Sequence, residues 1–350
     1  MELQSFISEN NNYSDLFKKE GLKVVKYRNL LLVKNYYDKP LSYSDENDYW
    51  KMYCRGAVID TLSNKVVCLP PVKSVEYNTI SDDSSYLGTE IQYLIDGTMI
   101  NLFYHKEWLL STRSEIGGKN KWTDKKSFKQ MFDECLDKNM DYDKLDKAYC
   151  YSFVMRHKDN RNVSPIKENK LFLVEAYDLN KNERLNISNI NLDIEKIDNI
   201  SFNDLIEFNS YEIKGYTIKY GNKRYKKINP LFEKVKELKP NMNNDLLNYI
   251  ELRKNGNLKD YFKYFPEYSK QFDEYRNKIH NLSNQLYNNY KNCYVFKKKE
   301  RKEIPYHLKP LTDDIHKKYL NSKVPTSWSD IKNYIHSLPS KKLMFALNYS

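Results

Sequence analysis

Apolar and polar residues alternate in short runs over the first two thirds of the chain, which is typical of β-strands. The runs predict strands within residues 23–37, 56–71, 89–113, 150–157, 170–179 and 212–228. Two connections inside them, Asp60–Asn64 and Tyr104–Glu107, have the length of hairpin turns. Residues 125–136 instead carry apolar side chains at helical spacing, which predicts a helix with these residues on one side: Phe128, Met131, Phe132 and Leu136.

The pattern changes near residue 230, beyond which apolar residues recur at steps of three and four. The clearest case is residues 266–294, where Pro266 suits a first helical turn and one long helix with a core-facing stripe is expected. A final helix is expected to begin at Ser329 or Asp330 and to end near Leu338. We therefore expect an α+β protein, with antiparallel sheets and flanking helices over residues 1–235 and an all-α domain over residues 236–350.

The charge of the chain favours a polyanionic partner. Its 350 residues include 58 Lys and Arg against 47 Asp and Glu, a net charge of +11. This excess suits RNA, DNA or an acidic membrane face, although solubility alone also accounts for it. The run Lys297–Glu303 is expected to be an exposed loop that is either solvated or in contact with RNA.

Composition also excludes some classes of protein. The mean hydropathy is −0.82, and no apolar run approaches the roughly 18 residues of a membrane span, which excludes an integral membrane protein. The first residues are polar and unlike a cleaved signal sequence. Five cysteines without regular spacing predict free thiols, no zinc site and a cytoplasmic location.

A series of short motifs runs along the chain in a fixed order: Cys54-Arg55-Gly56, VCLPPVK over 67–73, Asp96-Gly97-Thr98 between two strands, LLSTR ending at Arg113, YSFVMRHKDNRNV over 151–163, and Lys214-Gly215-Tyr216 before RYKKINP. In order and spacing these motifs resemble the T4 RNA ligase 1-like family of covalent nucleotidyltransferases, which is related to DNA ligases and mRNA capping enzymes. The resemblance extends over nearly the whole chain. It implies an ATP-grasp-like RNA ligase domain followed by an all-α C-terminal domain.

The resemblance also implies a chemistry, and the chain departs from it. In the family, the lysine of a Lys-x-Asp-Gly motif attacks the α-phosphate of ATP and carries AMP to an RNA 5′-phosphate. Here that position is Leu94, whose alkyl side chain cannot form a phosphoramidate. The position of a metal-binding glutamate is Lys214, where an ammonium favours a phosphate over a divalent cation. Lys73 and Lys106 are the nearest lysines that could replace the missing amine.

Two further positions depart less strongly from the family pattern. The glutamate often found in the family's Phe-Glu-Phe-Val pattern is Ser152 here. The closing lysine pair reads Lys226-Lys227-Ile228, and since side chains alternate along a strand, Lys227 should point away from Lys226. Ile228 would then occupy the second phosphate-facing place.

Other positions match family residues that surround the nucleotide: Arg55, Gly56, Lys73, Asp96, Gly97, Arg113 and Lys226. The cationic ones offer donors to phosphate oxygens, and the misplaced Lys214 adds another. Asp96 is expected to accept a hydrogen bond from a ribose hydroxyl. Tyr177 falls near the family's base-stacking strand, although a buried core tyrosine is an equal alternative.

These matches and departures predict a catalytically inactive RNA-ligase-like protein. We expect it to bind RNA by a nucleotide or a modified, cap-like 5′ end in the former active-site pocket. A purine nucleotide or cap analogue would then be a ligand and not a required cofactor, and no metal is expected. Two alternatives remain open: an active ligase or nucleotidyltransferase that uses a displaced lysine or pre-adenylylated RNA, and an interaction protein whose helical domain docks a partner. The composition and the resemblance together suggest a viral source.

Overall fold

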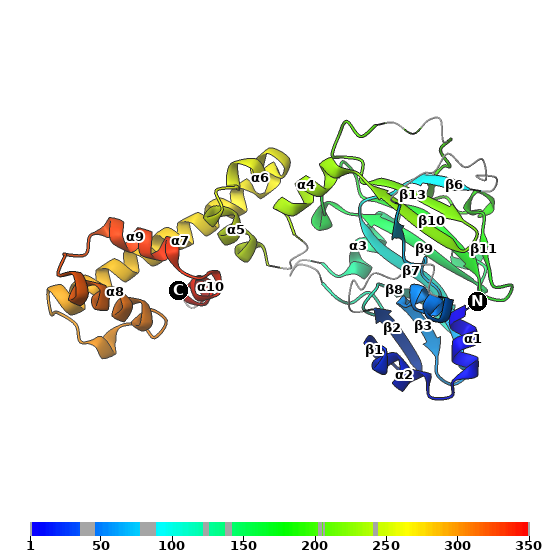
Figure 1. Cartoon of the computed structure of the whole chain (residues 1–350), viewed down its shortest axis with the longest axis horizontal. Coiled ribbons are helices and arrows are strands. Elements are labelled where there is room, and N and C mark those ends of the chain that lie inside the picture. The colour runs from blue at the N-terminus through cyan, green and yellow to red at the C-terminus, as the bar shows by residue number, and fades with distance from the viewer. Residues whose placement is uncertain are drawn as a thin grey trace. The chain divides into compact units, whose positions relative to one another are not determined.

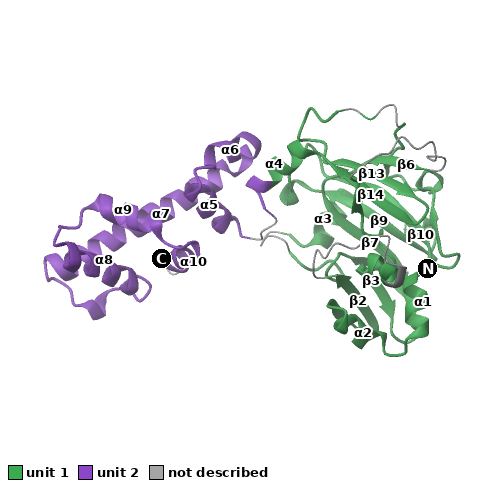
Figure 2. Cartoon of the chain, viewed as in Figure 1, with its two compact units in different colours: residues 1–236 green, residues 237–350 purple. Residues whose placement is uncertain are grey.

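The computed structural model describes residues 2–35, 46–77, 89–121, 126–136, 142–201, 205, 207–240 and 244–348. The chain divides into two compact units, unit 1 over residues 1–236 and unit 2 over residues 237–350 (Figure 2). All described strands belong to unit 1, whereas unit 2 is helical. The expected α+β architecture of antiparallel sheets followed by a helical region is therefore confirmed.

The first sheet of unit 1 has the order β1-β2-β3-β4, and all its neighbours are antiparallel. Its strands are β1 (Leu22–Tyr27), β2 (Leu30–Asn35), β3 (Arg55–Asp60) and β4 (Lys65–Cys68). The helices α1 (Glu2–Glu9) and α2 (Tyr13–Lys19) pack against this sheet (Figure 1). They bury Leu3, Ile7 and Phe17 against Leu31 and Val33, so burial of apolar area holds this layer together.

The second sheet has the order β11-β10-β9-β7-β8, with β12 pairing in parallel with β10. Its strands are β7 (Thr98–His105), β8 (Glu107–Ser111), β9 (Tyr149–Arg156), β10 (Lys170–Asp178), β11 (Glu183–Leu185) and β12 (Glu195–Lys196). Helix α3 (Phe128–Cys135) packs on one face through Phe128 and Phe132. Met99, Val154 and Val174 form a separate apolar cluster, since side chains alternate between the two faces of the strands.

The third sheet has the order β5-β14-β13-β6. Its strands are β5 (Val75–Glu76), β6 (Glu90–Tyr93), β13 (Gly215–Tyr220) and β14 (Lys223–Ile228), and helix α4 (Pro230–Leu238) follows. One face is apolar and buries Ile91, Tyr216 and Ile218. The alternate positions carry polar or charged side chains: Gln92, Thr217, Lys219, Arg224 and Lys226. A sheet with a polar face that is largely buried is well placed to bind a ligand.

Unit 2 consists of α5 (Asp245–Lys254), α6 (Leu258–Tyr264), α7 (Ser269–Tyr290), α8 (Lys309–Ser322), α9 (Trp328–Ser337) and α10 (Ser340–Asn348). The long helix expected over 266–294 is confirmed as a 3₁₀ turn at Pro266–Tyr268, then α7, then a π-helical turn at Lys291–Val295. Its predicted apolar stripe is buried at Phe272, Ile279, Leu282, Leu286 and Tyr290.

Local capping shifts two of the expected helix ends. Helix α9 begins at Trp328 because the Ser327 hydroxyl accepts a hydrogen bond from the Asp330 backbone N–H, at 3.2 Å. It is not the final helix, because α10 begins directly after Pro339. Helix α3 begins at Phe128, where Ser127 and Gln130 form a capping box, and residue 125 lies outside the described residues. Within the described part of the chain, none of the helices has the length and apolar character needed to cross a membrane.

Candidate functional site: a basic cavity between two sheets

A cavity of about 410 Å³ lies in unit 1 between the second and third sheets. The second sheet contributes Met99, Val154 and Val174, and Gly97 lies just before β7. The polar positions of the third sheet complete the opposite wall: Gln92, Thr217, Arg224, Lys226 and Ile228. Further parts of the lining are formed by Arg55, Lys73 and Arg113. Helix α4 contributes Phe232, Glu233 and Lys236. The cavity thus joins segments that are far apart in the sequence.

The lining is strongly basic. Seven cationic side chains contribute to it, against the single carboxylate of Glu233: Arg55, Lys73, Arg113, Lys214, Arg224, Lys226 and Lys236. Burial lowers the pKa of the Lys214 ammonium, and the charges of Lys236 and Lys226 lower it further. Lys226 and Lys236 are therefore near enough to repel the Lys214 ammonium, which Asp96 offsets in part, and a bound phosphate would relieve that repulsion.

Leu94, at the expected position of the attacking amine, lines this cavity. Its backbone N–H donates to the carbonyl of Gly215, the residue after Lys214, at 2.8 Å. The cavity wall at this place therefore carries an alkyl side chain, with an ammonium on the neighbouring strand.

The Asp96 carboxylate contacts groups of the protein, whereas the sequence predicted a contact with a ribose hydroxyl. Its Oδ2 accepts hydrogen bonds from the backbone N–H groups of Val163 and Ser164, at 2.9 and 3.0 Å. Its Oδ1 lies 3.7 Å from the Lys214 Nζ, and its side chain is only 5% exposed. Asp96 does not line the cavity, so the predicted contact with a ribose hydroxyl is not supported by this geometry. The carboxylate instead fixes the 163–164 segment and pairs with Lys214.

The glycines of the motifs allow close packing around the cavity. A Cβ on Gly97 would lie 2.5 Å from the Met155 carbonyl oxygen and 2.7 Å from Val154 Cγ1, which excludes any larger residue. Gly56 has φ +102°, and a Cβ there would lie 2.9 Å from the Arg113 Cα. Gly56 does not line the cavity, but it lets the backbone of β3 approach that of Arg113.

The closing lysine pair has the geometry that strand alternation predicts. Lys226 and Ile228 line the cavity, whereas Lys227 lies on the other face with Tyr216 and Ile218. Lys226 Nζ is 2.7 Å from Glu76 Oε1, and the two side chains are 33% and 54% exposed. Such an exposed pair contributes only about 0–1 kcal/mol, so a phosphate can compete with Glu76 for Lys226.

Three other candidate residues lie outside this cavity. Ser152 is buried in β9 and donates its hydroxyl hydrogen bond to Asn101 Oδ1 at 2.8 Å. Tyr177 packs against the core of the first sheet and lines a separate small pocket, where burial raises its pKa to about 12. The base-stacking role expected for Tyr177 in this cavity is therefore not supported. Lys106 is exposed at the turn between β7 and β8, with φ +64°.

Two cations of the lining did not emerge from the motifs. Arg224 lies two residues before Lys226 on β14, so alternation from Lys226 could have placed it on the same face. Its Nη1 donates to Glu175 Oε2 at 2.8 Å, which holds it at the back of the cavity. Lys236 lies four residues after Phe232 on α4, which puts the two on one side of that helix.

The divalent metal that the resemblance implies does not fit this lining. A hard cation needs several oxygen ligands, and Glu233 is the one carboxylate among seven cations in the described lining. The position of the family's metal-binding glutamate carries the Lys214 ammonium, which would repel a metal ion.

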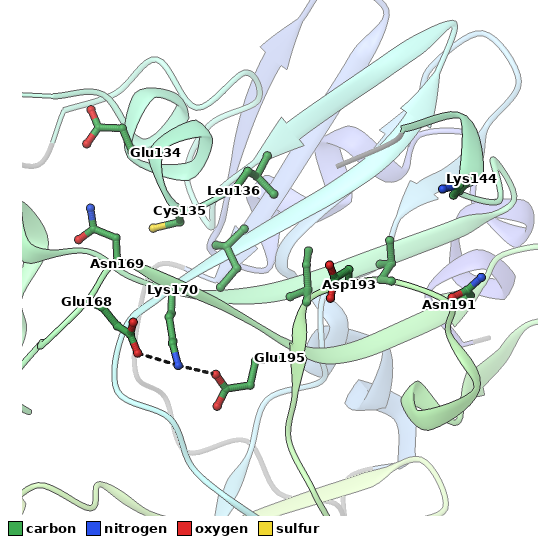
Figure 3. Close-up of a pocket in the computed structure, with 13 residues that line it drawn as sticks. Glu134, Cys135, Leu136, Lys144, Glu168, Asn169, Lys170, Asn191, Asp193 and Glu195 are labelled. Atoms are coloured by element: carbon green, nitrogen blue, oxygen red, sulfur yellow. Dashed lines mark hydrogen bonds and ion pairs between the residues drawn. The ribbon is translucent and has the colours of Figure 1, made fainter. Parts of the chain in front are cut away.

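A second cavity of about 440 Å³ lies elsewhere in unit 1, between the end of α3, the start of β10 and residues 191–195 (Figure 3). Four carboxylates contribute to its lining: Glu134, Glu168, Asp193 and Glu195. Lys170 lies between Glu168 and Glu195, with N–O distances of 2.8 and 3.0 Å (Figure 3). This lining is less suited to a phosphate than that of the basic cavity.

Comparison with known proteins gives partial similarities. No family model matches the chain. A stretch of 98 residues is 28% identical to an immediate-early protein ICP-46 homolog of Invertebrate iridescent virus 3, over 25% of this chain. The match spans only about a fifth of that relative, 22% of its length.

The chain is also similar to two solved structures. An archaeal ATP-dependent RNA ligase has a TM-score of 0.45 and 11% identity, over 78% of this chain and 73% of that chain. A putative ATP-dependent DNA ligase from Aquifex aeolicus has a TM-score of 0.38 and 14% identity, over 75% of this chain and 69% of that chain.

Proposed function

We propose that unit 1 is a catalytically inactive, RNA-ligase-like domain that binds the phosphate-bearing 5′ end of an RNA, or a purine nucleotide, in the basic cavity. The observation that carries this proposal is the composition of the lining. Seven cations and one carboxylate surround a cavity whose position for an attacking amine is occupied by Leu94. The groups that bind phosphate are present, whereas the group that would form a bond to phosphorus is replaced.

The lining supplies two kinds of contact to such a ligand. The guanidinium groups of Arg55 and Arg113 can donate paired hydrogen bonds to phosphate oxygens, and the lysine ammonium groups act as point charges. The apolar wall of Met99, Val154 and Val174 offers a surface for the face of a base. A triphosphate or a cap-like 5′ end combines a base with several phosphates and therefore suits both parts.

The proposal is tested by titrating the full chain with a short RNA carrying a 5′-triphosphate, and with a cap analogue, by calorimetry. The double variant Arg55→Ala/Lys73→Ala should bind the cap analogue, which has no length of single strand, about a hundredfold more weakly, because each charge-assisted hydrogen bond contributes about 1.5 kcal/mol or more. Lys65 and Lys167 are exposed cations outside the cavity lining. The matched control Lys65→Ala/Lys167→Ala should bind within about twofold of the wild type.

Wild-type binding should also weaken as salt is raised. If the two double variants bind the cap analogue with equal affinity, the proposal is wrong. It is also wrong if the wild type binds a 5′-hydroxyl RNA as tightly as the same RNA with a 5′-triphosphate.

One observation favours a second candidate, a nucleotidyltransferase that uses a displaced lysine. Lys73 and Lys214 both line the cavity, and burial lowers the pKa of Lys214, which increases the share of neutral, nucleophilic amine. Lys106 lies outside the lining and is no longer a candidate for this role. Incubation with α-labelled ATP or GTP and magnesium, followed by a denaturing gel, separates the two functions. Label on the protein that disappears in Lys214→Ala or Lys73→Ala would establish the enzyme.

A further inference from the structure

The net positive charge of the chain lies mostly in unit 2. Residues 237–350 contain 21 Lys and Arg against 12 Asp and Glu, an excess of nine, whereas residues 1–236 contain 37 against 35, an excess of two. The basic cavity of unit 1 is thus a local arrangement within a nearly neutral unit. The charge that attracts a polyanion over longer distances belongs to the helical unit.

Part of this charge lies on the exposed connection between α7 and α8 (Figure 1). We call residues 295–299 the lysine loop. Val295 and Phe296 are 54% and 51% exposed, and Lys297, Lys298 and Lys299 are exposed directly after them. Large apolar side chains and cations are therefore presented together at one place.

The lysine loop is held by hydrogen bonds at its start and by packing beyond its end. The Phe296 N–H donates to the Lys291 carbonyl at 2.8 Å, and the N–H groups of Lys298 and Lys299 donate to the Asn292 carbonyl at 2.7 and 3.2 Å. Downstream, Arg301 Nε donates to Asp313 Oδ1 at 2.9 Å, and the Ile304 side chain is 2% exposed. Its lysines are therefore presented by a defined backbone, which reduces the entropy lost on binding.

The chemistry of the lysine loop fits a single strand of nucleic acid. The ammonium groups of Lys291 and Lys298 lie 4.9 and 5.5 Å from the centre of the Phe296 ring. Within the described part of unit 2, Lys297 and Lys299 have no carboxylate within 4.0 Å, so no ion pair competes with a phosphate there. A further ring, Tyr306, is 78% exposed on the same connection. Exposed rings beside unneutralised lysines are the means by which proteins stack bases and hold the backbone of a single strand.

We propose that the lysine loop, together with Tyr306, is a binding surface for single-stranded nucleic acid. It is a site separate from the cavity and does not rest on the function proposed for the cavity. An acidic membrane is a poorer partner, because Val295 and Phe296 are only two apolar residues and the loop has no amphipathic helical face to insert.

The test uses the full chain and a 20-nucleotide, 3′-fluorescein-labelled RNA with a 5′-hydroxyl, which offers the cavity no terminal phosphate. Binding is followed by fluorescence anisotropy over a range of salt concentrations. The variant Lys297→Glu/Lys298→Glu/Lys299→Glu should bind at least about tenfold more weakly, and its salt slope should be smaller by about 2, since three phosphate contacts are lost. Phe296→Ala should weaken binding by about tenfold through lost stacking.

The matched control is Lys259→Glu/Lys270→Glu/Lys278→Glu, which changes three exposed lysines of α6 and α7 by the same total charge. It should bind within about threefold of the wild type, because general attraction over a Debye length is screened at moderate salt.

Several results would overturn the proposal: no RNA binding by the wild type at low salt, equal losses in the two triple variants, or equal affinity for a duplex of the same sequence. Loop-dependent binding to phosphatidylserine vesicles with loop-independent binding to RNA would overturn it as well.

Discussion

At the scale of single residues, the character of the cavity is set by Leu94 and Lys214. Leu94 places an alkyl chain where the sequence resemblance implies a nucleophile, and Lys214 places an ammonium where it implies a carboxylate; both line the cavity. In the structure the Lys214 Nζ lies 3.7 Å from Asp96 Oδ1, so this carboxylate offsets part of the ammonium charge. Both side chains line the basic cavity, and Leu94 pairs through its backbone with Gly215, the residue after Lys214.

The variant Leu94→Lys is therefore expected to stay inactive. It adds an amine beside Lys214 in a lining that already has seven cations, but it restores no carboxylate for a metal. Incubation with α-labelled ATP and magnesium should leave the single variant unlabelled, and Leu94→Lys/Lys214→Glu is the variant in which labelling should first be detected. Rapid labelling of the single variant would show that Lys214 does not block the reaction.

At the residue level, the motifs indicate side chains that share one cavity, whereas their contacts with a ligand stay predictions. Arg55, Lys73, Arg113, Lys214 and Lys226 were placed near a ligand by their motifs, and all line one cavity. Asp96, also expected at the ligand, accepts hydrogen bonds from the N–H groups of Val163 and Ser164, a distant segment that no local pattern indicates. Long-range contacts of this kind decide whether a polar side chain faces a ligand or the protein.

At the scale of elements, the third sheet depends on a buried group of charges on its polar face. Lys219 on β13 donates to the Val174 carbonyl of β10 at 3.0 Å and lies 3.6 Å from Glu175 Oε2. Arg224 on β14 bonds the same carboxylate oxygen at 2.8 Å. This group joins the second and third sheets at the back of the cavity.

Burial lowers the pKa of Lys219 from 10.5 to about 8, although Glu175 opposes the change. Between these values the unfolded chain binds more protons than the folded one, so the contribution of Lys219 to the free energy of unfolding rises with pH. The free energy of unfolding of the wild type, relative to that of Lys219→Met, should therefore rise by roughly 2 kcal/mol between about pH 7 and about pH 9.5. Chemical denaturation of both proteins at several pH values measures this difference in the free energy of unfolding.

The control for this prediction is Lys227→Met, which removes a lysine from an exposed position of β14. If the free energies of unfolding of the two variants, each relative to the wild type, change equally over this pH range, the role given to Lys219 is contradicted.

The sequence predicted individual elements better than their assembly. Alternation located the two hairpins of β3–β4 and β7–β8 and the two faces of β14, and helical spacing located α3 and α7. The division into three sheets and the parallel pairings of β5 and β12 could not be predicted, since they depend on packing between distant strands. Helix α10 was not predicted, because the expected final helix ends near Leu338 and a proline, which interrupts helices, follows; the chain resumes a helix directly after that proline.

At the scale of the whole molecule, the net charge of +11 has two origins. A nearly neutral unit 1 gathers seven cations around one cavity, and a basic unit 2 carries an excess of nine charges. The total charge indicated a polyanionic partner but gave no location for it. Variants of the cavity and of the lysine loop should consequently respond to different features of an RNA, its 5′ end in the first case and its single-stranded length in the second.

The central claim, that the basic cavity holds a phosphate-bearing nucleotide, is tested most directly by a crystal structure of the full chain grown with GTP. The account predicts density for the nucleotide beside Leu94, with phosphate oxygens within hydrogen-bond distance of Arg55, Lys73 or Lys226 and no covalent bond to a lysine. An empty basic cavity at a saturating GTP concentration, or GTP seated in the acidic cavity of Figure 3, would contradict it.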